Sequence, residues 1–593
     1  MTENTNETPL ISRRRLMQLG GLSALGLPLL LEACGTAAAP ANSSAASGAS
    51  ASSPASSPSS PSSAGAPASG GSAAPKAQPF PTYAAIQGGP KPDYHSSDPR
   101  ITDGFDNYPA NPAKFMTGAA PGTGAKMDVF IANLYPPPTP YDQNPTWKAI
   151  NKQLNENVQM NMVSARDFNT RLATVMAGGN LPDTLFMIGG VGGAPGFGSG
   201  FPVQFLETQC SDLTPYLAGS AAKDYPNLAA IPTYSWRTSV AAGKLYGIPI
   251  HRYLPTFWFF ANSDVWNKEV GATTVPKDAA DFKKILQQLN QPKANRWAIG
   301  NYVSSVNYGL VGYAEMFGAP NNWRLDSSGK LTKNYETEEY KAAVGYLKDI
   351  LSSGLMPPDV STGKNSRDDF IAGKFVTSVE AFGQGFNDFW RRGLLQKPAT
   401  HFSMITPFAS TAGAKPVHYF SGGLIAVNVL KKAAPARIKE ILRVMNWLAV
   451  PFGTQEDVLL SYGLSGADYT LDAKGNPNPT KVGLSQAAYV PWQYIGHHPF
   501  VWYQAGLPGY AKASFEYEQQ LVKVGIDDPT IGFLSPTSST KGVVANNTFS
   551  DGINDLLTGR RPLTDYDQLV KDWRNSAGDQ IRKELQDAMA AAK

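Results

Sequence analysis

A regular alternation of strand-like and helix-like segments sets the strongest limit on how this chain can fold. The apolar run Lys126–Leu134 has the length of a strand, and residues 158–162 alternate between apolar and polar as a second strand would. A third apolar run, Thr184–Ile188, follows a stretch with hydrophobic residues at helical spacing. Strand, helix, strand, helix, strand over this length predicts a parallel sheet covered by helices, which is an α/β fold.

The loops after the first and third predicted strands are candidates for a ligand site. In a parallel α/β sheet, ligands bind beyond the carboxyl ends of the strands. The turn-rich segment Tyr135–Tyr141 and the glycine-rich segment Gly189–Phe201 come directly after two of these strands. We therefore expect both loops at the ligand-binding edge.

Composition narrows the class of protein further. The chain has 593 residues, 42% hydrophobic and 11% aromatic, and cores usually divide beyond about 250–300 residues, so we expect two lobes. A formal net charge of +4 along so long a chain argues against nucleic acid as a partner. The two cysteines, Cys34 and Cys210, leave no disulfide framework and no cysteine-based metal site if Cys34 is modified as described next.

The first 33 residues have the order of an export signal. A basic patch with paired arginines, Ser12–Met17, is typical of twin-arginine export, and the general secretory route is the alternative. The apolar run Leu19–Leu31 is shorter than the ~20 residues needed to span a bilayer. Ala33-Cys34 resembles the lipobox of bacterial lipoproteins, which implies cleavage before Cys34 and a lipid on its thiol. An ordinary secretion signal with an incidental cysteine is the alternative interpretation.

Two segments separate this signal from the folded body. Residues 34–78 are nearly all Ala, Ser, Pro and Gly, which cannot bury enough apolar surface to fold, so we expect a disordered tether. As a flexible coil of roughly 45 residues it would span about 40 Å, although a linker without a selected length remains an alternative. Residues 79–124 keep many Pro, Gly and Asp residues but gain aromatics, which predicts an irregular arm packed on the body.

The body resembles a known family. The motifs that carry the resemblance occur in the expected order and together cover nearly all of residues 126–593; they are Phe168–Asp183 (FNTRLATVMAGGNLPD), Gly243–Pro249 (GKLYGIP), Trp258–Val270, Phe370–Lys374 (FIAGK), Tyr419–Val427 and Gly559–Lys583. Their sequences resemble those of the extracellular solute-binding proteins, family 1, of ABC importers, the family that includes maltose-binding protein. Each motif is weak alone, and the order and spacing make the resemblance specific.

This resemblance implies a two-lobed, periplasmic-binding-protein-like type II fold with the ligand between lobes joined by hinge strands. We expect residues 125–258 and 421–534 in the first lobe and residues 259–420 and 535–593 in the second, with crossings near Phe257–Asn262, Ser421–Val427 and Phe533–Thr540. The resemblance further implies a monomeric, lipid-anchored receptor on the outer face of the cell membrane. It would bind a solute, deliver it to ABC permease subunits, and need neither catalysis nor a cofactor.

Aromatic and polar side chains in the family-equivalent loops suggest the ligand. Flat aromatic faces suit the C–H face of a sugar, and Glu, Gln, Arg and His suit its hydroxyl rim. We therefore predict a neutral carbohydrate, specifically an oligosaccharide, with peptides or amino acids as the alternative. The candidate residues are Tyr135, Tyr141, Arg252, Tyr253, Trp258, Glu380, Phe382, Gln384, Phe386, Tyr419, Phe420, Trp492, Tyr494 and His497. Any one of these aromatics could instead pack in the core, as we expect for Trp147, Trp447 and Trp573 on helical stripes.

Enzymatic and metal-binding alternatives have weaker support. Ser361–Lys364 and Ser538–Lys541 fit the S-x-x-K pattern of β-lactamases, but the partner motifs S-D-N and K-T-G are missing. We expect His497 and His498 to point apart, because neighbours on a helix or strand do, and so not to share a metal. The Asp326–Lys330 and Asp472–Pro477 segments predict hairpin turns and lack the ligand pattern of a calcium loop. An exported glycosidase needs only two carboxylates and remains the alternative function; an adhesin would show repeats, which are absent.

The signal analysis predicts that Cys34 anchors the protein. Two or three acyl chains hold a lipoprotein firmly, whereas one binds membranes only marginally. Replacing Cys34 with Ala should therefore release the folded body into the medium, as measured by immunoblotting of cell and medium fractions. A Cys210→Ala variant is the control and should stay cell-bound. Retention of the processed Cys34→Ala protein on the membrane would contradict the assignment.

Overall fold

The computed structural model describes residues 78–190, 192, 200–300, 309–360 and 366–592. All of them belong to one compact unit, Ala74–Lys593. The predicted signal, Cys34 and all but the last residue of the tether lie outside the described residues, as do most of the glycine-rich loop and Ser361–Lys364. None of the described helices is both long and apolar enough to cross a bilayer.

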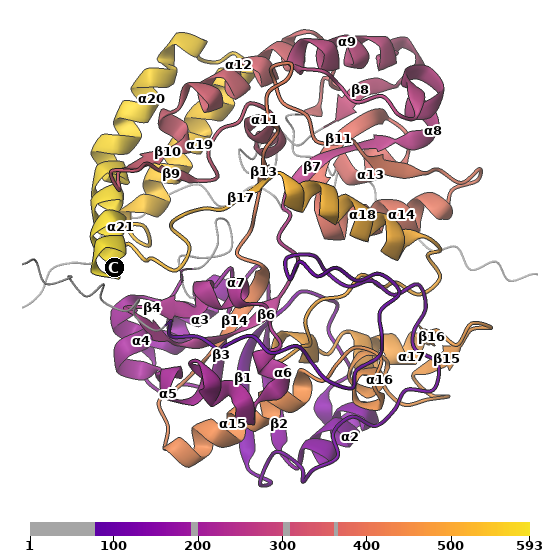
Figure 1. Cartoon of the computed structure of the whole chain (residues 1–593), viewed down its shortest axis with the longest axis vertical. Helices are drawn as coiled ribbons and strands as arrows, with labels where there is room; N and C mark the ends of the chain where they lie inside the picture. Colours follow the sequence, from indigo (N-terminus) through magenta and orange to yellow (C-terminus); the bar gives the residue numbers. More distant parts are fainter. Residues whose placement is uncertain (1–77, 191, 193–199, 301–308, 361–365, 593) are drawn as a thin grey trace, which may run out of the picture. The chain divides into compact units, whose positions relative to one another are not determined.

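The first lobe is built on a five-stranded sheet (Figure 1). Its strands follow the spatial order β2 (Asn157–Ser164), β1 (Lys126–Asn133), β3 (Thr184–Ile188), β14 (Leu424–Leu430) and β6 (Gly247–His251). β1 is parallel to β2 and β3, whereas β14 is antiparallel to β3 and β6. β1, β3 and β6 therefore end at the same edge. The predicted parallel alternation is confirmed, with one antiparallel strand returning from much later in the chain.

Local signals explain the helices that cover this sheet. Asn144 caps the first of them by accepting a hydrogen bond from the Trp147 backbone N–H. Pro145 occupies the first helical position, where the backbone N–H that proline lacks would have no partner within the helix. Trp147 and Trp447 are buried in the first-lobe core, as expected. The principal helices of this lobe are α2 (Pro145–Leu154), α3 (Phe168–Ala177), α4 (Val203–Gln209), α15 (Pro435–Leu448) and α16 (Gln455–Tyr462).

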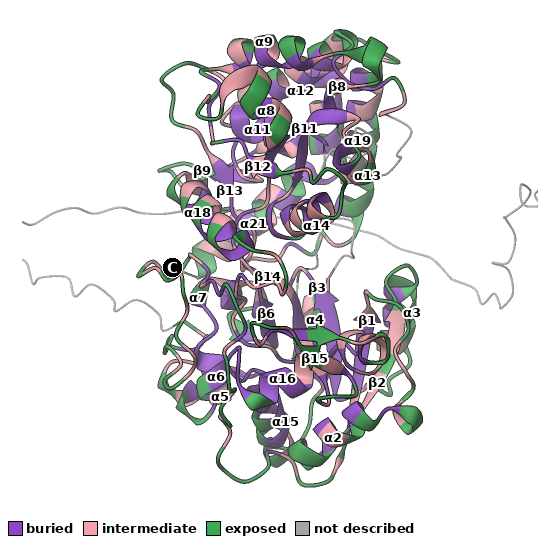
Figure 2. Cartoon of the chain, turned by 90° about the vertical axis from the view of Figure 1, so that its right-hand side faces the viewer, coloured by how far each residue is buried: buried purple, intermediate pink, exposed green. Residues whose placement is uncertain are grey.

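The second lobe contains a four-stranded sheet and the C-terminal helices. The strand order is β12 (Phe402–Met404), β7 (Phe257–Asn262), β11 (Phe375–Ala381) and β8 (Trp297–Gly300), with β7 antiparallel to β11 and β12. Figure 2 shows the strands of both lobes as largely buried, while the surrounding helices expose one side. Trp573 is buried here, as expected. The principal helices are α9 (Ala279–Leu289), α12 (Glu338–Ser352), α14 (Phe382–Leu394), α18 (Tyr510–Lys523), α19 (Lys541–Thr558), α20 (Tyr566–Trp573) and α21 (Asp579–Ala591).

The chain passes between the lobes at positions that differ in part from the expected ones. β7, which we expected to cross, lies wholly in the second sheet, and the crossing comes just before it, at residues 252–256. This segment lies beside the return crossing, since Pro255 bridges Phe420 and the Ser421 N–H donates to Leu254 O at 2.8 Å. α18 packs in the second-lobe core, so residues 421–534 are not all first lobe and a crossing falls at residues 496–509 rather than near Phe533–Thr540. Core membership of α18 depends on contacts distant in sequence, which motif order does not reveal.

The arm, residues 79–124, is irregular and contacts both lobes (Figure 1, indigo). Phe80 and Met116 pack against the first-lobe core, and Tyr94 and Ile101 against the second-lobe core. Between these contacts, Phe105 and Tyr108 join Phe452 in a small separate cluster. The arm is therefore part of the folded body.

One buried carboxyl group holds the arm to the second lobe. Glu518 on α18 is fully buried, and its Oε2 accepts the Thr102 N–H at 2.9 Å and the Trp502 Nε1–H at 2.7 Å. Its Oε1 accepts the Thr102 hydroxyl at 3.0 Å. Burial raises the pKa of Glu518 to about 7 from an ordinary value of 4.5, although the hydrogen bonds from Trp502 and Thr102 oppose this shift.

This shift predicts a pH-dependent free energy of unfolding. The folded protein holds the Glu518 proton more tightly than the unfolded chain, so the stabilisation is complete below about pH 4.5 and is lost as pH rises through about 7. Between pH 5 and pH 8, the free energy of unfolding of the wild type should fall by about 2–3 kcal/mol more than that of Glu518→Gln, whose side chain cannot ionise. Urea unfolding at the two pH values measures this difference.

The matched control is Glu516→Gln, an exposed residue on the same helix, which should keep the wild-type pH dependence. Equal pH dependence in the wild type and Glu518→Gln would contradict the assigned shift.

Candidate ligand-binding site

The site candidates that come together lie at the edge where β1, β3 and β6 end. Tyr135 follows β1, and Arg252 directly follows β6. Tyr494 packs against Phe186 of β3, with ring centroids 5.8 Å apart. Because the three strands are parallel to one another, this edge is the one where such sheets bind ligands.

Three tyrosines form a stack of nearly parallel rings. Tyr135 lies 6.2 Å from Tyr494 and 6.3 Å from Tyr489, with interplanar angles of 7° and 14°. The hydroxyls of Tyr135 and Tyr494 are 3.2 Å apart, and Gln493 Nε2 donates to the Tyr135 hydroxyl at 3.1 Å. Tyr135 is 37% exposed and Tyr494 only 3%. This tyrosine stack (Tyr135, Tyr489 and Tyr494) therefore combines a flat apolar surface with fixed polar groups.

Arg252 lies near this stack on the first crossing. Its Nη1 donates to the His251 carbonyl at 2.9 Å, and its guanidinium lies 5.3 Å from the Phe500 ring centroid. Burial raises the pKa of the Tyr494 hydroxyl, and Arg252 opposes that rise through its charge and a hydrogen bond. His251 is buried between Tyr234 and Phe500, and burial, reinforced by Arg252, lowers its pKa to about 3. His251 is therefore neutral at physiological pH.

Tyr253 connects the crossing to the second lobe. Its ring stacks on Trp502 with centroids 4.9 Å apart, and its hydroxyl accepts the Gln384 backbone N–H at 3.2 Å. Gln384 is exposed at the start of α14, directly after β11. Through this hydrogen bond Tyr253 joins the crossing to the start of α14 in the second lobe.

Most of the other predicted aromatics are packed in the cores. Trp258 is fully buried on β7 and its indole N–H donates to Ile405 O at 2.6 Å. These residues lie on the sides of strands and helices that pack against the core. We therefore leave them out of the proposed site. Besides Trp258 they are Phe382, Phe386, Tyr419, Phe420 and Trp492, all at most 7% exposed; Tyr141 is half-buried against Trp147.

The two remaining polar candidates, Glu380 and His497, are both largely buried. Glu380 is 6% exposed and accepts a hydrogen bond from Arg367 Nε at 2.9 Å. The rings of His497 and His498 do not point apart but lie 3.9 Å apart by centroid, because this segment is neither helix nor strand. Burial lowers the pKa of His497 well below its ordinary range, so its ring is neutral. Among the described residues no group of three or more His, Cys, Asp and Glu side chains could hold a metal.

Sequence reasoning missed four side chains of this region. They are Tyr489, Gln493, Phe500 and Trp502, all in the irregular segment around the third crossing. Their proximity to the predicted residues Trp492, Tyr494 and His497 was the available signal. No periodic pattern marks this segment, so its side-chain directions could not be read from sequence.

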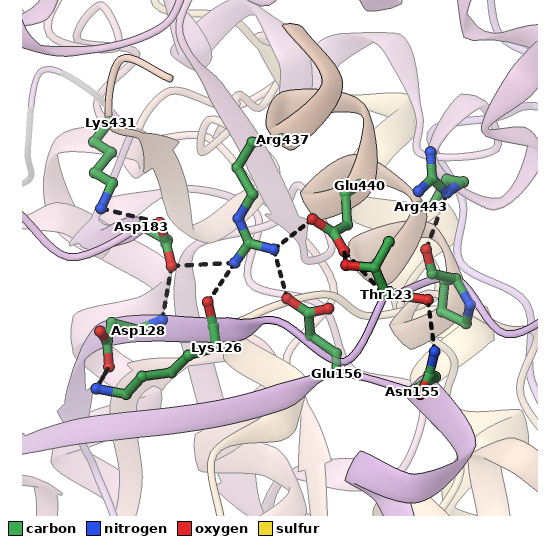
Figure 3. Close-up of polar contacts among 12 residues, drawn as sticks. Thr123, Lys126, Asp128, Asn155, Glu156, Asp183, Lys431, Arg437, Glu440 and Arg443 are labelled. Atoms are coloured by element: carbon green, nitrogen blue, oxygen red, sulfur yellow. Dashed lines mark hydrogen bonds and ion pairs between the residues drawn. The ribbon is translucent and has the colours of Figure 1, made fainter. Parts of the chain in front are cut away.

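The family signature ending in Asp183 has a structural role at the opposite edge. Figure 3 shows Asp183 and Glu440 on either side of Arg437. Arg437 Nη1 contacts Glu156 and Glu440 at 2.6 Å, and its Nη2 donates to the Lys126 carbonyl at 2.6 Å. Asp183 also accepts the backbone N–H of Asp128, at 2.9 Å. The signature therefore ties the amino ends of β1 and β3 to α15.

The two-lobed α/β fold, with its crossings beside a sheet edge lined by aromatic and polar groups, defines a ligand-binding protein of the periplasmic-binding-protein-like class. The family model for bacterial extracellular solute-binding proteins matches residues 147–456, more than half of the chain. The chain belongs to this family of bacterial extracellular solute-binding proteins.

Two relatives from Bacillus subtilis match most of the chain. Lipoprotein LipO is 22% identical over 495 residues, which cover 78% of this chain and 92% of the relative. The polygalacturonan/rhamnogalacturonan-binding protein YtcQ is 24% identical over 498 residues, covering 80% and 93%.

Solved structures share the fold. An HMO-binding, ABC-transporter-associated solute-binding protein from Bifidobacterium longum infantis gives a TM-score of 0.57 at 16% identity, covering 78% of this chain and 98% of that one. The N-glycan transport solute-binding protein of Streptococcus pneumoniae gives 0.54 at 15% identity, covering 79% and 99%.

The contacts of Arg437 predict that its replacement lowers the stability of the fold without changing ligand affinity. Arg437→Met should lower the free energy of unfolding by about 3–5 kcal/mol, since it leaves the mostly buried carboxylates Glu156 and Glu440 without their cation. Ligand affinity should not change, because the cluster lies at the edge opposite the site. Urea unfolding followed by circular dichroism measures the first, and titration calorimetry the second.

Arg443→Met on the same helix is the matched control. Arg443 Nε donates to the Pro121 carbonyl at 3.0 Å, and no carboxylate of the described residues forms an ion pair with it, so its loss should cost about 1 kcal/mol. Equal destabilisation by the two variants would show that the buried carboxylates do not depend on Arg437.

Proposed function

We propose that this protein is the lipid-anchored substrate-binding component of an ABC importer and that it captures an oligosaccharide. Ligand binding would favour the arrangement in which both lobes contact the sugar, because only then are all contacts made, and the permease subunits would receive the sugar from that state. The protein itself needs no catalytic step for this role.

The tyrosine stack is the observation that carries the carbohydrate assignment. A sugar offers apolar C–H faces of about the size of a tyrosine ring, and the hydroxyl of Tyr135 and the amide of Gln493 can bond its rim, with the buried Tyr494 hydroxyl holding Tyr135 in place. The names of the relatives agree with this ligand class: YtcQ binds polygalacturonan and rhamnogalacturonan, and the Bifidobacterium protein binds HMO.

The mode of attachment rests on sequence. Paired arginines, a short apolar run and Ala33-Cys34 support export by the twin-arginine route and a lipid anchor at Cys34. The relative LipO is named a lipoprotein. We propose that the tether then holds a monomeric receptor at the outer face of the cell membrane, within reach of its permease.

Titration calorimetry with oligosaccharide and peptide panels tests the proposed function. We expect stoichiometric binding of an oligosaccharide with no product formed, and Tyr135→Ala should weaken it about tenfold through loss of ring stacking. Tyr216→Ala is the matched control: it is a half-buried tyrosine on α5 (Thr214–Leu217), beside β5 (Lys244–Leu245) at the amino side of β6.

Three outcomes would contradict the proposal in different ways. Binding of peptides but not sugars would overturn the ligand class. Turnover of the sugar would favour the glycosidase alternative. Unchanged sugar affinity in Tyr135→Ala would overturn the site but not the ligand class.

A further inference from the structure

Arg252 differs from four other partly buried arginines of the protein. Arg296, Arg367, Arg437 and Arg582 have side chains 13–23% exposed, and each forms an ion pair with a carboxylate at 2.6–2.9 Å. Arg252 is also only partly exposed, yet no carboxylate of the described residues forms an ion pair with it. Its guanidinium donates to the His251 carbonyl and lies over the Phe500 ring.

The neighbouring groups do not compensate this charge. His251 and His497 are held neutral, mainly by burial and in part by the field of Arg252 itself. The buried acids of the neighbouring segments have other partners: Asp457 is 3.5 Å from His498 Nε2, and Glu518 accepts hydrogen bonds from Thr102 and Trp502. A partly desolvated guanidinium without an opposing charge is costly unless an anion binds it.

The position of Arg252 places it where a ligand would lie. It follows β6 at the same edge as Tyr135, and its guanidinium lies over the Phe500 ring. Arg252 is also among the groups that lower the pKa of the Tyr494 hydroxyl against the effect of burial, which places it close to the tyrosine stack. A sugar ring stacked on Tyr135 would therefore direct its substituents toward Arg252. The planar fork of a guanidinium matches the two oxygens of a carboxylate better than it matches a hydroxyl.

We propose that the ligand is an acidic oligosaccharide, and that Arg252 binds the carboxylate of a uronic acid residue. The inference rests on the proposed carbohydrate-binding function, and it replaces the neutral sugar expected from the sequence. Arg252 then determines specificity, because a neutral sugar would leave its charge unpaired in the bound state. Tyr135, with Tyr489 stacked beside it, supplies the surface common to acidic and neutral sugars.

Calorimetry with three matched ligands tests the proposal on the whole protein. The probes are trigalacturonate, its methyl ester, which keeps the shape but lacks the charge, and neutral galactotriose. We expect the acid to bind about 10-fold to 100-fold more tightly than the ester or galactotriose. Rising salt should weaken binding of the acid and leave that of the neutral sugars unchanged.

Variants separate the charge of Arg252 from its other contacts. Arg252→Gln should reduce affinity for the acid to that for the ester, and Arg252→Lys, which keeps the charge without the fork, should lie between. Arg324→Gln is the control; this arginine is half-exposed and paired with Glu339 on the second lobe, and acid binding should be unchanged. The comparison of acid with ester uses wild-type protein, so the test does not depend on the folding of any variant.

The outcomes distinguish this inference from the proposed function. Equal affinity for acid, ester and galactotriose in the wild type would overturn the role of Arg252 in binding uronates while leaving an oligosaccharide receptor. A loss of affinity in Arg252→Gln that is equal for acid and ester would overturn it as well. Binding of peptides with no binding of any sugar would overturn the proposed function itself.

Discussion

The rest of the structure depends on the paired crossings between the lobes, and a buried polar group fixes them. His418, fully buried next to the return crossing, accepts the Thr256 backbone N–H at its Nε2 (3.1 Å), and its Nδ1 lies 2.7 Å from Glu315 Oε2. The Thr256 hydroxyl donates to the Tyr419 carbonyl, which joins the outgoing segment to the returning one. Burial raises the pKa of Glu315, against the effect of His418. Because His418 and Glu315 are fully buried, their polar atoms need protein partners, and the bond from Thr256 to His418 holds the chain directly before β7.

Sequence patterns predicted the parts of the fold whose signals are local. The strand Thr184–Ile188 agrees with β3 at both ends, and β1 differs by one residue. The helix that begins at Pro145 has its capping residue and its buried face within one short stretch of the sequence. By contrast, α18 belongs to the second lobe through contacts such as those of Tyr510 and Tyr517 with Phe386 of α14, residues far apart in the chain. No local pattern specifies such a pairing, so the expected lobe boundary was wrong there.

Site residues could be predicted from the sequence where they directly follow a strand. They could not be predicted where packing against other elements decides which way the side chain points. Tyr135, Arg252 and Gln384 each follow a strand or start the helix after one, and each lies at least partly exposed. Trp258 and Phe382 stand in equally plausible motifs, but both are fully buried. An aromatic ring packs equally well in a hydrophobic core and against the apolar face of a sugar, so residue type alone does not distinguish a core residue from a binding residue. Only the fold decides, through which side of the strand or helix is covered.

The arm links this site to the stability of the whole body. Thr102 and Trp502 share the carboxyl group of Glu518, and Trp502 in turn stacks on Tyr253 at the crossing. The arm also joins the small cluster around Phe452 and packs against the first-lobe core. Any change in how the lobes meet around a ligand must therefore be accommodated by arm contacts on both lobes. The free energy of those contacts therefore enters the affinity for any ligand whose binding changes how the lobes meet.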